Sequence, residues 1–421
     1  MNIGFLDIVF IISFFGIVYY TIWVILLIIH SIHDPEYRKD FENIDPKLQL
    51  FVLIPMLNEA GVVQQTLSKF LEHTQTLPQV QLGVIDDCSS DGTADLIQKF
   101  IEENQCEKKI HLIRRTFPNA QTGKGDALNY GLEFIRQTIK VKEDETIIGV
   151  LDADAIMKEE DFQKVLLQFS TAPKLALLQT KVRMIHAKNW LQKMQDIEFA
   201  TINDWIQRVR NKINNAAASG NGQFIRMSSV EGNDTPWGNA LLEDFEFSTN
   251  FLLDNKETFY RTDIVVYQEA VDKVKPFIRQ RSRWVQGGLD CTFKYMKRIF
   301  HSPYLKFWAK FEMIFFMLLP FFTIMVGFCN FTSLIFALCN IDLFFNLILG
   351  LTGINFLLAT HTAVKYCGHD QKLKFKTIFY CGGMMIYNII LFPAIIIAFY
   401  RKITNKKTWI KTTHGVSTAS S

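Results

Sequence analysis

Long apolar stretches at both ends of the chain frame a polar middle section, and this layout limits the fold more than any other feature of the 421 residues. Residues 8–29 contain no charged side chain. About 22 helical residues are long enough to cross a hydrocarbon core of about 30 Å. A cleavable secretory signal is the alternative, but the apolar run is too long for one and no basic residue precedes it. The chain is therefore predicted to be part membrane-embedded and part globular.

Apolar residues return at 307–360, with a polar break near Asn340 and Asp342, and again at 375–400. This pattern predicts two further membrane spans and then a third. Lysine and arginine favour the cytoplasmic side of a membrane, and Arg38 and Lys39 follow the first span. We therefore expect a multi-pass protein of the plasma membrane whose middle section lies in the cytoplasm.

Basic residues also gather after the last apolar stretch, beginning with Arg401 and Lys402. Four spans would place this tail outside the cell, whereas its charge favours the inside. The sequence leaves the number of crossings and the side of the C-terminus open.

The middle section has the pattern of an α/β sheet, because short runs rich in β-branched residues alternate with amphipathic helical segments. Helices are predicted to begin near Gly61, Thr93, Lys124 and Glu160, and strands at 50–54, 81–85, 110–113, 146–151 and 175–180. We predict three parts, namely a membrane helix with a linker at 1–47, a globular domain with interfacial helices at 48–300, and membrane helices with a basic tail at 301–421. In a sheet of this kind, ligands bind outside the carboxyl ends of the strands.

The first acidic pair, Asp86 and Asp87, follows the predicted strand at 81–85 and leads into a polar turn. Carboxylates at a strand end can accept hydrogen bonds from a nucleobase or a ribose. The equally weighted alternative is a capped turn, in which Asp91 or Thr93 serves the next helix.

The second acidic cluster, Asp152 and Asp154, comes directly after the predicted strand at 146–151. Two hard oxygen ligands suit Mg²⁺ or Mn²⁺ carrying a diphosphate. Triplets of this kind are also common in surface turns, but the position at a strand end favours a metal site.

The third acidic pair, Glu243 and Asp244, stands at the expected start of a helix. A carboxylate there could take the proton from an acceptor hydroxyl, and the alternative is an acidic first turn that complements the helix dipole. Lys124 lies at another loop-to-helix junction, where a phosphate is favoured. Between these positions, residues 220–223 are expected to form a flexible, amide-bearing loop.

A last motif, containing Gln280, Arg283 and Trp284, precedes the C-terminal apolar block. The guanidinium of Arg283 can fork onto a phosphate, Gln280 can donate and accept, and Trp284 offers a flat face on which sugar rings stack. The alternative is a basic juxtamembrane helix held by anionic lipid, with the tryptophan as an interfacial anchor. A phosphate site beside a sugar platform indicates glycan synthesis.

In their order and spacing, these residues resemble the inverting family 2 glycosyltransferases, especially the membrane-integrated polysaccharide synthases of the cellulose, chitin and hyaluronan synthase group. The resemblance runs from the segment at 55–59 to Trp284 and the following spans. It implies a GT-A-type domain, with a mixed sheet flanked by helices, inserted between transmembrane helices. It also implies that Asp244 is the catalytic base and that Asp152 and Asp154 bind Mg²⁺ or Mn²⁺. The resemblance assigns the donor nucleotide to Glu59, Asp86, Asp87, Lys124 and Arg283, and the acceptor to Glu243, Gln280 and Trp284.

The expected function is polymerisation of a β-linked polysaccharide from a UDP-sugar, followed by its translocation. Glucose is the favoured sugar, with a cellulose-like or mixed-linkage β-glucan as product. The expected partners are the UDP-sugar donor, the growing polysaccharide acceptor, the lipid bilayer, and regulatory or export subunits.

Two alternatives belong to other classes. One is a non-processive transferase that adds a single sugar to a lipid acceptor, and the other is a structural or export subunit with an idle transferase domain. No nucleic-acid partner is expected, because the net charge is only +3 and the basic residues form no dense stripe interleaved with aromatic residues.

Overall fold

The computed structural model describes residues 4, 8–9, 11–16, 18–19, 22, 25, 29, 35–37, 40–339, 341–368 and 373–404. The first predicted membrane span, at 8–29, is described only in part, and the basic tail from residue 405 onward lies outside the described residues.

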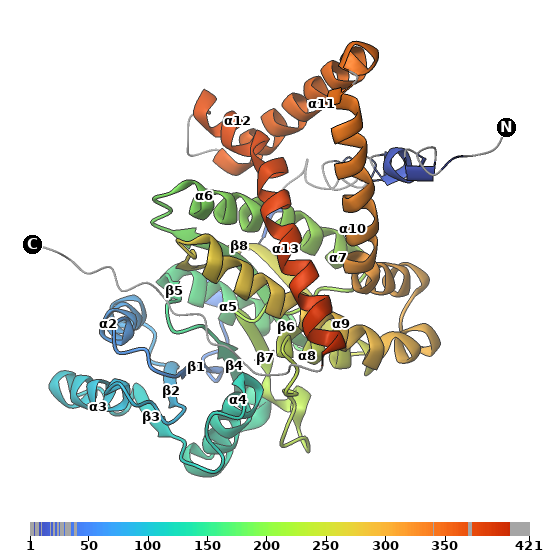
Figure 1. The fold of residues 1–421 in the computed structure, drawn as a ribbon. Helices are drawn as coiled ribbons and strands as arrows, with labels where there is room; N and C mark the ends of the chain where they lie inside the picture. Colours follow the sequence, from blue (N-terminus) through green and yellow to red (C-terminus); the bar gives the residue numbers. More distant parts are fainter. Residues whose placement is uncertain are drawn as a thin grey trace, which may run out of the picture.

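A mixed sheet forms the centre of the fold (Figure 1). Within the described residues it has eight strands, in the order β3-β2-β1-β4-β7-β6-β8-β5. Strands β1 to β4 are mutually parallel, whereas β7 runs antiparallel to both β4 and β6, and β5 runs antiparallel to β8. The strands are β1 (Gln49–Met56), β2 (Val80–Asp86), β3 (Ile110–Arg114), β4 (Thr146–Val150), β5 (Ile156–Met157), β6 (Leu175–Ile185), β7 (Gln223–Arg226) and β8 (Glu257–Glu269).

Strand β1 shows why this part of the chain lies at the centre of the sheet. Leu50, Val52 and Ile54 alternate with Phe51 and Leu53, and all five side chains are buried. Successive side chains of a strand point to opposite faces, so a continuous apolar run requires cover on both faces. The first set joins one core cluster and the second set joins another, one on each side of the sheet.

Helices supply that cover. On one face lie α2 (Val63–Thr74), α3 (Thr93–Asn104) and α5 (Glu159–Thr171), and on the other lie α4 (Lys124–Phe134) and α8 (Glu243–Leu253). Short 3₁₀ or π turns complete the domain, at η1 (Phe41–Asn43), η2 (Ile135–Ile139), η3 (Glu143–Glu145) and η5 (Met227–Val230).

The five strands predicted from sequence are confirmed, and the helices begin within two residues of the predicted positions. Strands β5, β7 and β8 were not predicted. The segment at 220–223 was predicted to be a flexible loop. Residues 220–222 do form a turn, but Asn221 is buried at 2% exposure and Gln223 is already the first residue of β7, so the turn is packed against the sheet.

A second layer of helices joins the sheet to the apolar C-terminal part. A continuous helical run consists of α6 (Trp190–Ile197), the π-helix η4 (Glu198–Asn203) and α7 (Asp204–Lys212). The long helix α9 (Val274–His301) follows β8 and carries the Gln280 to Trp284 motif.

Among the described residues, four apolar helices follow α9, and α10 and α11 extend away from the sheet (Figure 1). They are α10 (Phe307–Cys339), α11 (Ile341–Cys367), α12 (Phe375–Gly382) and α13 (Met384–Ile403). Among the described residues, two helical stretches are long and apolar enough to cross a membrane, Phe307–Cys339 and Phe375–Ile403. Three C-terminal spans were predicted, and the finding supports two candidates.

The end of α13 lies beside α9. Arg401 Nε donates to Gln286 Oε1 at 2.8 Å, and Lys402 pairs with Asp290. The first two basic residues of the tail therefore lie against α9, the helix that carries the Gln280 to Trp284 motif.

Candidate active site

Lys124 is the hub of a charged cluster at the carboxyl edge of the sheet. Its Nζ lies 2.7 Å from Asp152 Oδ1, 3.2 Å from the Gly220 carbonyl oxygen and 3.7 Å from Glu243 Oε1. The residues come from the start of α4, the end of β4, the turn before β7 and the start of α8. Parallel strands end at one edge, and β7 begins there because it runs antiparallel to β4, so four distant segments meet.

The neighbours of Lys124 stabilise its charged form. Burial disfavours the ammonium form, but the carboxylates of Asp152 and Glu243 outweigh this effect and raise the pKa of Lys124 above its ordinary value. A permanently charged amine at the first residue of a helix is suited to an anionic ligand.

Asp244 is the most perturbed carboxyl group of the cluster. Its side chain is buried, and Oδ1 accepts a hydrogen bond from the Phe245 amide at 2.8 Å. Burial, followed by repulsion from Glu243, raises the pKa of Asp244 to about 7. A carboxyl group with this pKa can accept a proton near neutral pH, as general base catalysis requires.

Gly220 leaves room for Asp244. A Cβ atom on this glycine would lie 3.1 Å from Asp244 Oδ2, and its φ of +78° is a conformation that favours glycine. The turn before β7 can therefore approach the carboxylate closely while presenting its carbonyl oxygen to Lys124.

Arg283 on α9 lies near this cluster, and Gln280 lies about one turn earlier on the same helix. Among the residues that the structure describes, neither side chain has a hydrogen bond or an ion pair. Burial lowers the pKa of Arg283, and the carboxylates of Glu243, Asp152 and Asp244 act in the opposite direction. A guanidinium near three carboxylates, with its donors unused, can bind an anion such as a diphosphate.

The acidic pair after β2 divides into two roles. Asp87 Oδ1 accepts from Arg115 Nη1 at 2.6 Å and from the Gln121 amide at 2.9 Å, so this carboxylate is tied to the loop after β3. Asp86 Oδ2 accepts only a long bond of 3.3 Å from the Ser89 amide, and Oδ1 is buried with no partner among the described residues. A buried acceptor of this kind is costly unless a ligand satisfies it, which fits contact with a nucleobase or ribose.

The capped-turn alternative at this strand end is also present. Asp91 accepts hydrogen bonds from the Thr93 amide at 3.0 Å and from the Ala60 amide at 3.0 Å. The Glu59 amide donates to Thr93 Oγ1 at 2.9 Å, and Glu59 is buried at 8% exposure. Asp91 therefore stabilises the turn, and Glu59 lies beside the same turn.

The two aspartates proposed as metal ligands point to different neighbours. Asp152 turns to Lys124, and its side chain is 39% exposed. Asp154 is buried, and its Oδ2 accepts from the Glu269 amide at 2.8 Å. In the part of the chain that the structure describes, no three carboxylate, histidine or cysteine side chains form a metal cluster. The oxygen donors fit Mg²⁺ or Mn²⁺ only if phosphate and water complete the coordination, as these ions commonly require.

Trp284 is held by Arg281, a residue that the sequence reasoning passed over. The Arg281 guanidinium lies over the indole ring at 4.4 Å from its centroid, and Phe199 contacts the indole edge-on at 6.4 Å. The partners of Arg281 lie on helices distant in sequence, and only the presence of a second arginine in the motif could have drawn attention to it.

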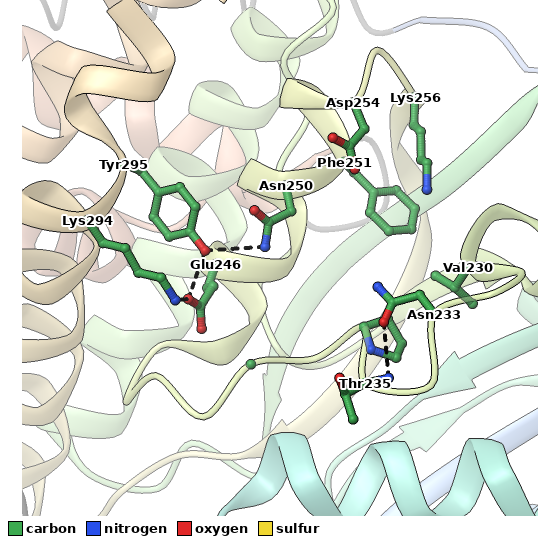
Figure 2. Close-up of a pocket in the computed structure, with 12 residues that line it drawn as sticks. Val230, Asn233, Thr235, Glu246, Asn250, Phe251, Asp254, Lys256, Lys294 and Tyr295 are labelled. Carbon is green, nitrogen blue, oxygen red and sulfur yellow. Dashed lines mark hydrogen bonds and ion pairs between the residues drawn. The ribbon is translucent and has the colours of Figure 1, made fainter.

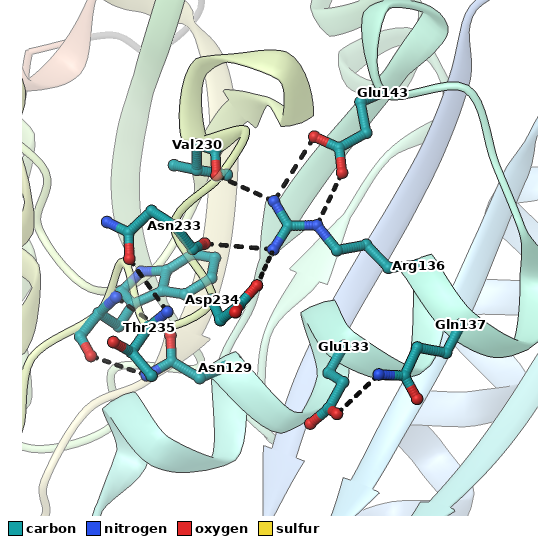
Figure 3. A network of polar contacts seen from close by, with 10 residues as sticks. Asn129, Glu133, Arg136, Gln137, Glu143, Val230, Asn233, Asp234 and Thr235 are labelled. Carbon is teal, nitrogen blue, oxygen red and sulfur yellow. Dashed lines mark hydrogen bonds and ion pairs between the residues drawn. The ribbon is translucent and has the colours of Figure 1, made fainter.

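The loop at 231–242 fixes where α8 begins. Figure 3 shows Arg136 reaching into this loop, where it donates to the carbonyl oxygens of Val230 at 2.9 Å and Asn233 at 3.1 Å. Asn129 on α4 bonds both to the amide and to the carbonyl oxygen of Trp237. The loop is thus attached to the helix that carries Lys124, which ties the position of Asp244 to that of Lys124.

The opposite side of α8 is clamped to α9. In Figure 2, Glu246 faces Lys294 and Tyr295, and Tyr295 Oη donates to Glu246 Oε1 at 2.8 Å. These residues line a hollow of about 290 Å³. Residues two apart on a helix point in nearly opposite directions, so this hollow lies behind Asp244 and is separate from the charged cluster.

A family model described as glycosyl transferase family group 2 matches residues 147–357, and one described as glycosyl transferase family 2 matches residues 51–231. The chain is 26% identical over 268 residues to the probable glycosyltransferase YdaM of Bacillus subtilis, covering 63% of this chain and 60% of that protein.

Two further relatives are named for different products. The poly-beta-1,6-N-acetyl-D-glucosamine synthase of Staphylococcus epidermidis is 26% identical over 244 residues, covering 58% of this chain and 55% of that protein. The beta-monoglucosyldiacylglycerol synthase of Trichormus variabilis is 26% identical over 261 residues, covering 62% of this chain and 52% of that protein. The chain thus matches between about half and three-fifths of the length of these relatives.

The fold also matches a solved structure over nearly its full length. This is the mannosyltransferase PcManGT from Pyrobaculum calidifontis in complex with GDP-Man and Mn²⁺, with a TM-score of 0.63 and 14% identity. The match covers 96% of this chain and 99% of that one. The predicted GT-A-type fold is therefore confirmed.

Proposed function

Because the chain belongs to glycosyl transferase family group 2, we propose that it is an inverting transferase that builds a β-linked polysaccharide from a UDP-sugar. The observation that carries this proposal is the cluster of Lys124, Asp152 and Asp244, which lies near the guanidinium of Arg283. It combines a cationic site for a diphosphate with a carboxylate of neutral pKa, which are the two elements that sugar transfer requires.

In the proposed reaction, Asp244 takes the proton from an acceptor hydroxyl. The oxygen attacks the anomeric carbon of the donor sugar, the bond from that carbon to the diphosphate breaks, and the configuration inverts. Lys124 and Arg283 stabilise the negative charge that develops on the departing nucleoside diphosphate. A divalent cation bound by Asp152 with help from Asp154 would supply further charge neutralisation to the diphosphate.

We also propose binding roles for the other predicted site residues. Asp86, with its unsatisfied buried oxygen, is proposed to contact the uridine, while Asp87 and Glu59 support the surrounding loops. Glu243, Gln280 and Trp284 are proposed to bind the acceptor, with the indole as a stacking platform. We keep glucose as the proposed sugar, and N-acetylglucosamine is the next candidate because relatives include synthases for both.

A second candidate function is the transfer of one sugar to a lipid acceptor such as diacylglycerol. The relative that is named for this reaction supports it, as do the two apolar helical stretches that lie C-terminal to the motif. Both functions use the same donor site and differ in the acceptor and in the number of transfers. In either case, we propose that the protein is anchored in the plasma membrane with its catalytic domain in the cytoplasm.

Product size separates the two functions. The purified full chain in nanodiscs is incubated with Mg²⁺ or Mn²⁺ and with each radiolabelled UDP-sugar or GDP-mannose in turn, with and without diacylglycerol. A large product that a β-glucanase or an N-acetylglucosaminidase degrades would support the synthase. A short, solvent-extractable product that requires diacylglycerol would support the lipid transferase. Transfer from GDP-mannose alone would overturn the proposed uridine site.

A further inference from the structure

Arg281, inside the acceptor motif, is bound by two residues outside it. Its Nη1 and Nη2 lie 3.1 and 2.6 Å from the two carboxylate oxygens of Glu198, which is a bidentate pair. Tyr387 Oη accepts from Arg281 Nη2 at 3.2 Å and donates to Glu198 Oε2 at 2.6 Å. The three side chains form a closed triangle of hydrogen bonds.

The triangle is shielded from water, so its hydrogen bonds are strong. Tyr387 is fully buried at 0% exposure, and the side chains of Arg281 and Glu198 are 9% and 16% exposed. A buried charge that loses a partner is expensive, because the remaining group keeps its desolvation penalty. Removing one member should therefore shift the other two.

Aromatic rings connect the triangle to the acceptor platform. The Arg281 guanidinium lies 5.0 Å from the ring centroid of Phe277 and 5.6 Å from that of Phe199, in addition to its contact with Trp284 at 4.4 Å. A guanidinium stacks on an aromatic face through cation–π attraction. Arg281 thus covers one face of the Trp284 indole and fixes the orientation of the ring. The indole is partly exposed, so its remaining surface can contact a ligand.

The three members come from three different parts of the fold. Arg281 lies on α9, Glu198 is the first residue of the π-helix η4, and Tyr387 lies on the apolar helix α13. A π-helical turn inside an α-helical run is rare and often marks a functional position. Helix α13 runs alongside α9, from Tyr387 at Arg281 to Arg401 at Gln286.

We propose that Glu198, Arg281 and Tyr387 are positioning residues that hold Trp284 and so set the affinity for the acceptor. Helix α13 supports the motif through Tyr387. This inference rests on the proposed function, because it assumes that Trp284 binds the acceptor. None of the three residues belongs to the cluster around Lys124, so the donor site should be independent of them.

The test compares two matched tyrosine substitutions. Tyr387→Phe removes only the hydroxyl group from the triangle and keeps the packed ring. Tyr366→Phe is the control, because Tyr366 on α11 also bonds a carboxylate, that of Asp196, and also lies against an arginine, Arg183. That second group lies outside the acceptor motif. The full chain in nanodiscs is assayed for acceptor KM, donor KM, kcat and donor hydrolysis by water.

Tyr387→Phe is expected to raise the acceptor KM about ten-fold, the loss typical of one hydrogen bond to charged partners. Donor KM and the hydrolysis of donor by water should not change, and a polymer product should become shorter. Tyr366→Phe should leave all four quantities unchanged. Arg281→Lys is a second variant, and it should reproduce the rise in acceptor KM because an ammonium cannot bond bidentately or stack.

An unchanged acceptor KM in both Tyr387→Phe and Arg281→Lys, with a wild type that transfers sugar, would overturn the inference alone. Equal losses in donor and acceptor affinity, or the same loss in Tyr366→Phe, would also overturn it, since they would indicate a general loss of structure. A wild type that neither transfers sugar nor hydrolyses any donor would overturn the proposed function itself.

Discussion

Replacing Asp244 by asparagine should stabilise the protein above pH 7 while it removes transfer activity. The Asp244 carboxyl is buried beside Glu243, and these surroundings raise its pKa from the ordinary 3.8 to about 7. The unfolded chain ionises this group at low pH, but the folded chain resists ionisation. The fold is therefore penalised as the pH rises from about 4 to about 7, and the whole penalty is present above pH 7.

The size of the penalty follows from the pKa. Each pH unit of displacement corresponds to about 1.4 kcal/mol, so keeping Asp244 charged costs the fold on the order of 4 kcal/mol above pH 7. Asparagine has nearly the same shape and no charge, so Asp244→Asn avoids this cost. At about 2 °C per kcal/mol for a domain of this size, the variant should unfold about 8 °C higher at pH 8.

Thermal unfolding in nanodiscs, followed by tryptophan fluorescence at about pH 5 and about pH 8, measures the effect. The variant should exceed the wild type clearly at the higher pH and by much less at the lower pH, where Asp244 is protonated. Glu103→Gln is the control, because that side chain is 63% exposed on α3 and far from the cluster. A variant that is destabilised at pH 8, or that gains equally at both pH values, would refute the argument that Asp244 is a strained carboxylate.

Three further outcomes are expected. Gly287→Ala should destabilise the protein by about 1–3 kcal/mol in chemical unfolding and reduce transfer, because the added Cβ would lie 2.6 Å from Leu242 Cβ. Gly288→Ala is the control, since a Cβ there meets open space, and it should be neutral or stabilising. Lys124→Gln should weaken UDP binding about ten-fold or more, as measured by calorimetry. Lys142→Gln, which changes a side chain that is 74% exposed, should leave UDP binding unchanged. Equal affinities in both variants would exclude Lys124 from the diphosphate site. The kcat/KM for transfer should rise with pH and level off above about 7, because the base must be deprotonated, and a flat profile would contradict that role.

The strands that could be predicted from sequence are marked by continuous apolar runs. Strands β1, β2 and β4 are buried on both faces and read as continuous apolar runs, so their ends and the acidic residues there were placed correctly. Strand β7 has only four residues and follows two glycines, which resembles a loop locally. Strand β8 alternates buried with partly exposed positions and includes charged residues, and its pairing with the distant β6 decides its conformation.

The candidate site divides in the same way. Lys124, Asp152 and Asp244 were predicted because each directly follows or begins an element whose position in an α/β sheet is known in advance. The neighbours of Arg281 could not be predicted, because Glu198 and Tyr387 lie 83 and 106 residues away on helices whose packing only the tertiary structure defines. The separate orientations of Asp152 and Asp154 likewise depend on contacts with α4 and β8.

The most direct test of the account is acceptor-dependent release of nucleoside diphosphate by the wild type and by Asp244→Asn at pH 8, alongside nucleotide binding. We expect the variant to be folded, to bind nucleotide like the wild type, and to transfer sugar about a thousand-fold more slowly because the general base is missing. A folded Asp244→Asn variant that transfers sugar at the wild-type rate would contradict the assignment of Asp244 as the catalytic base.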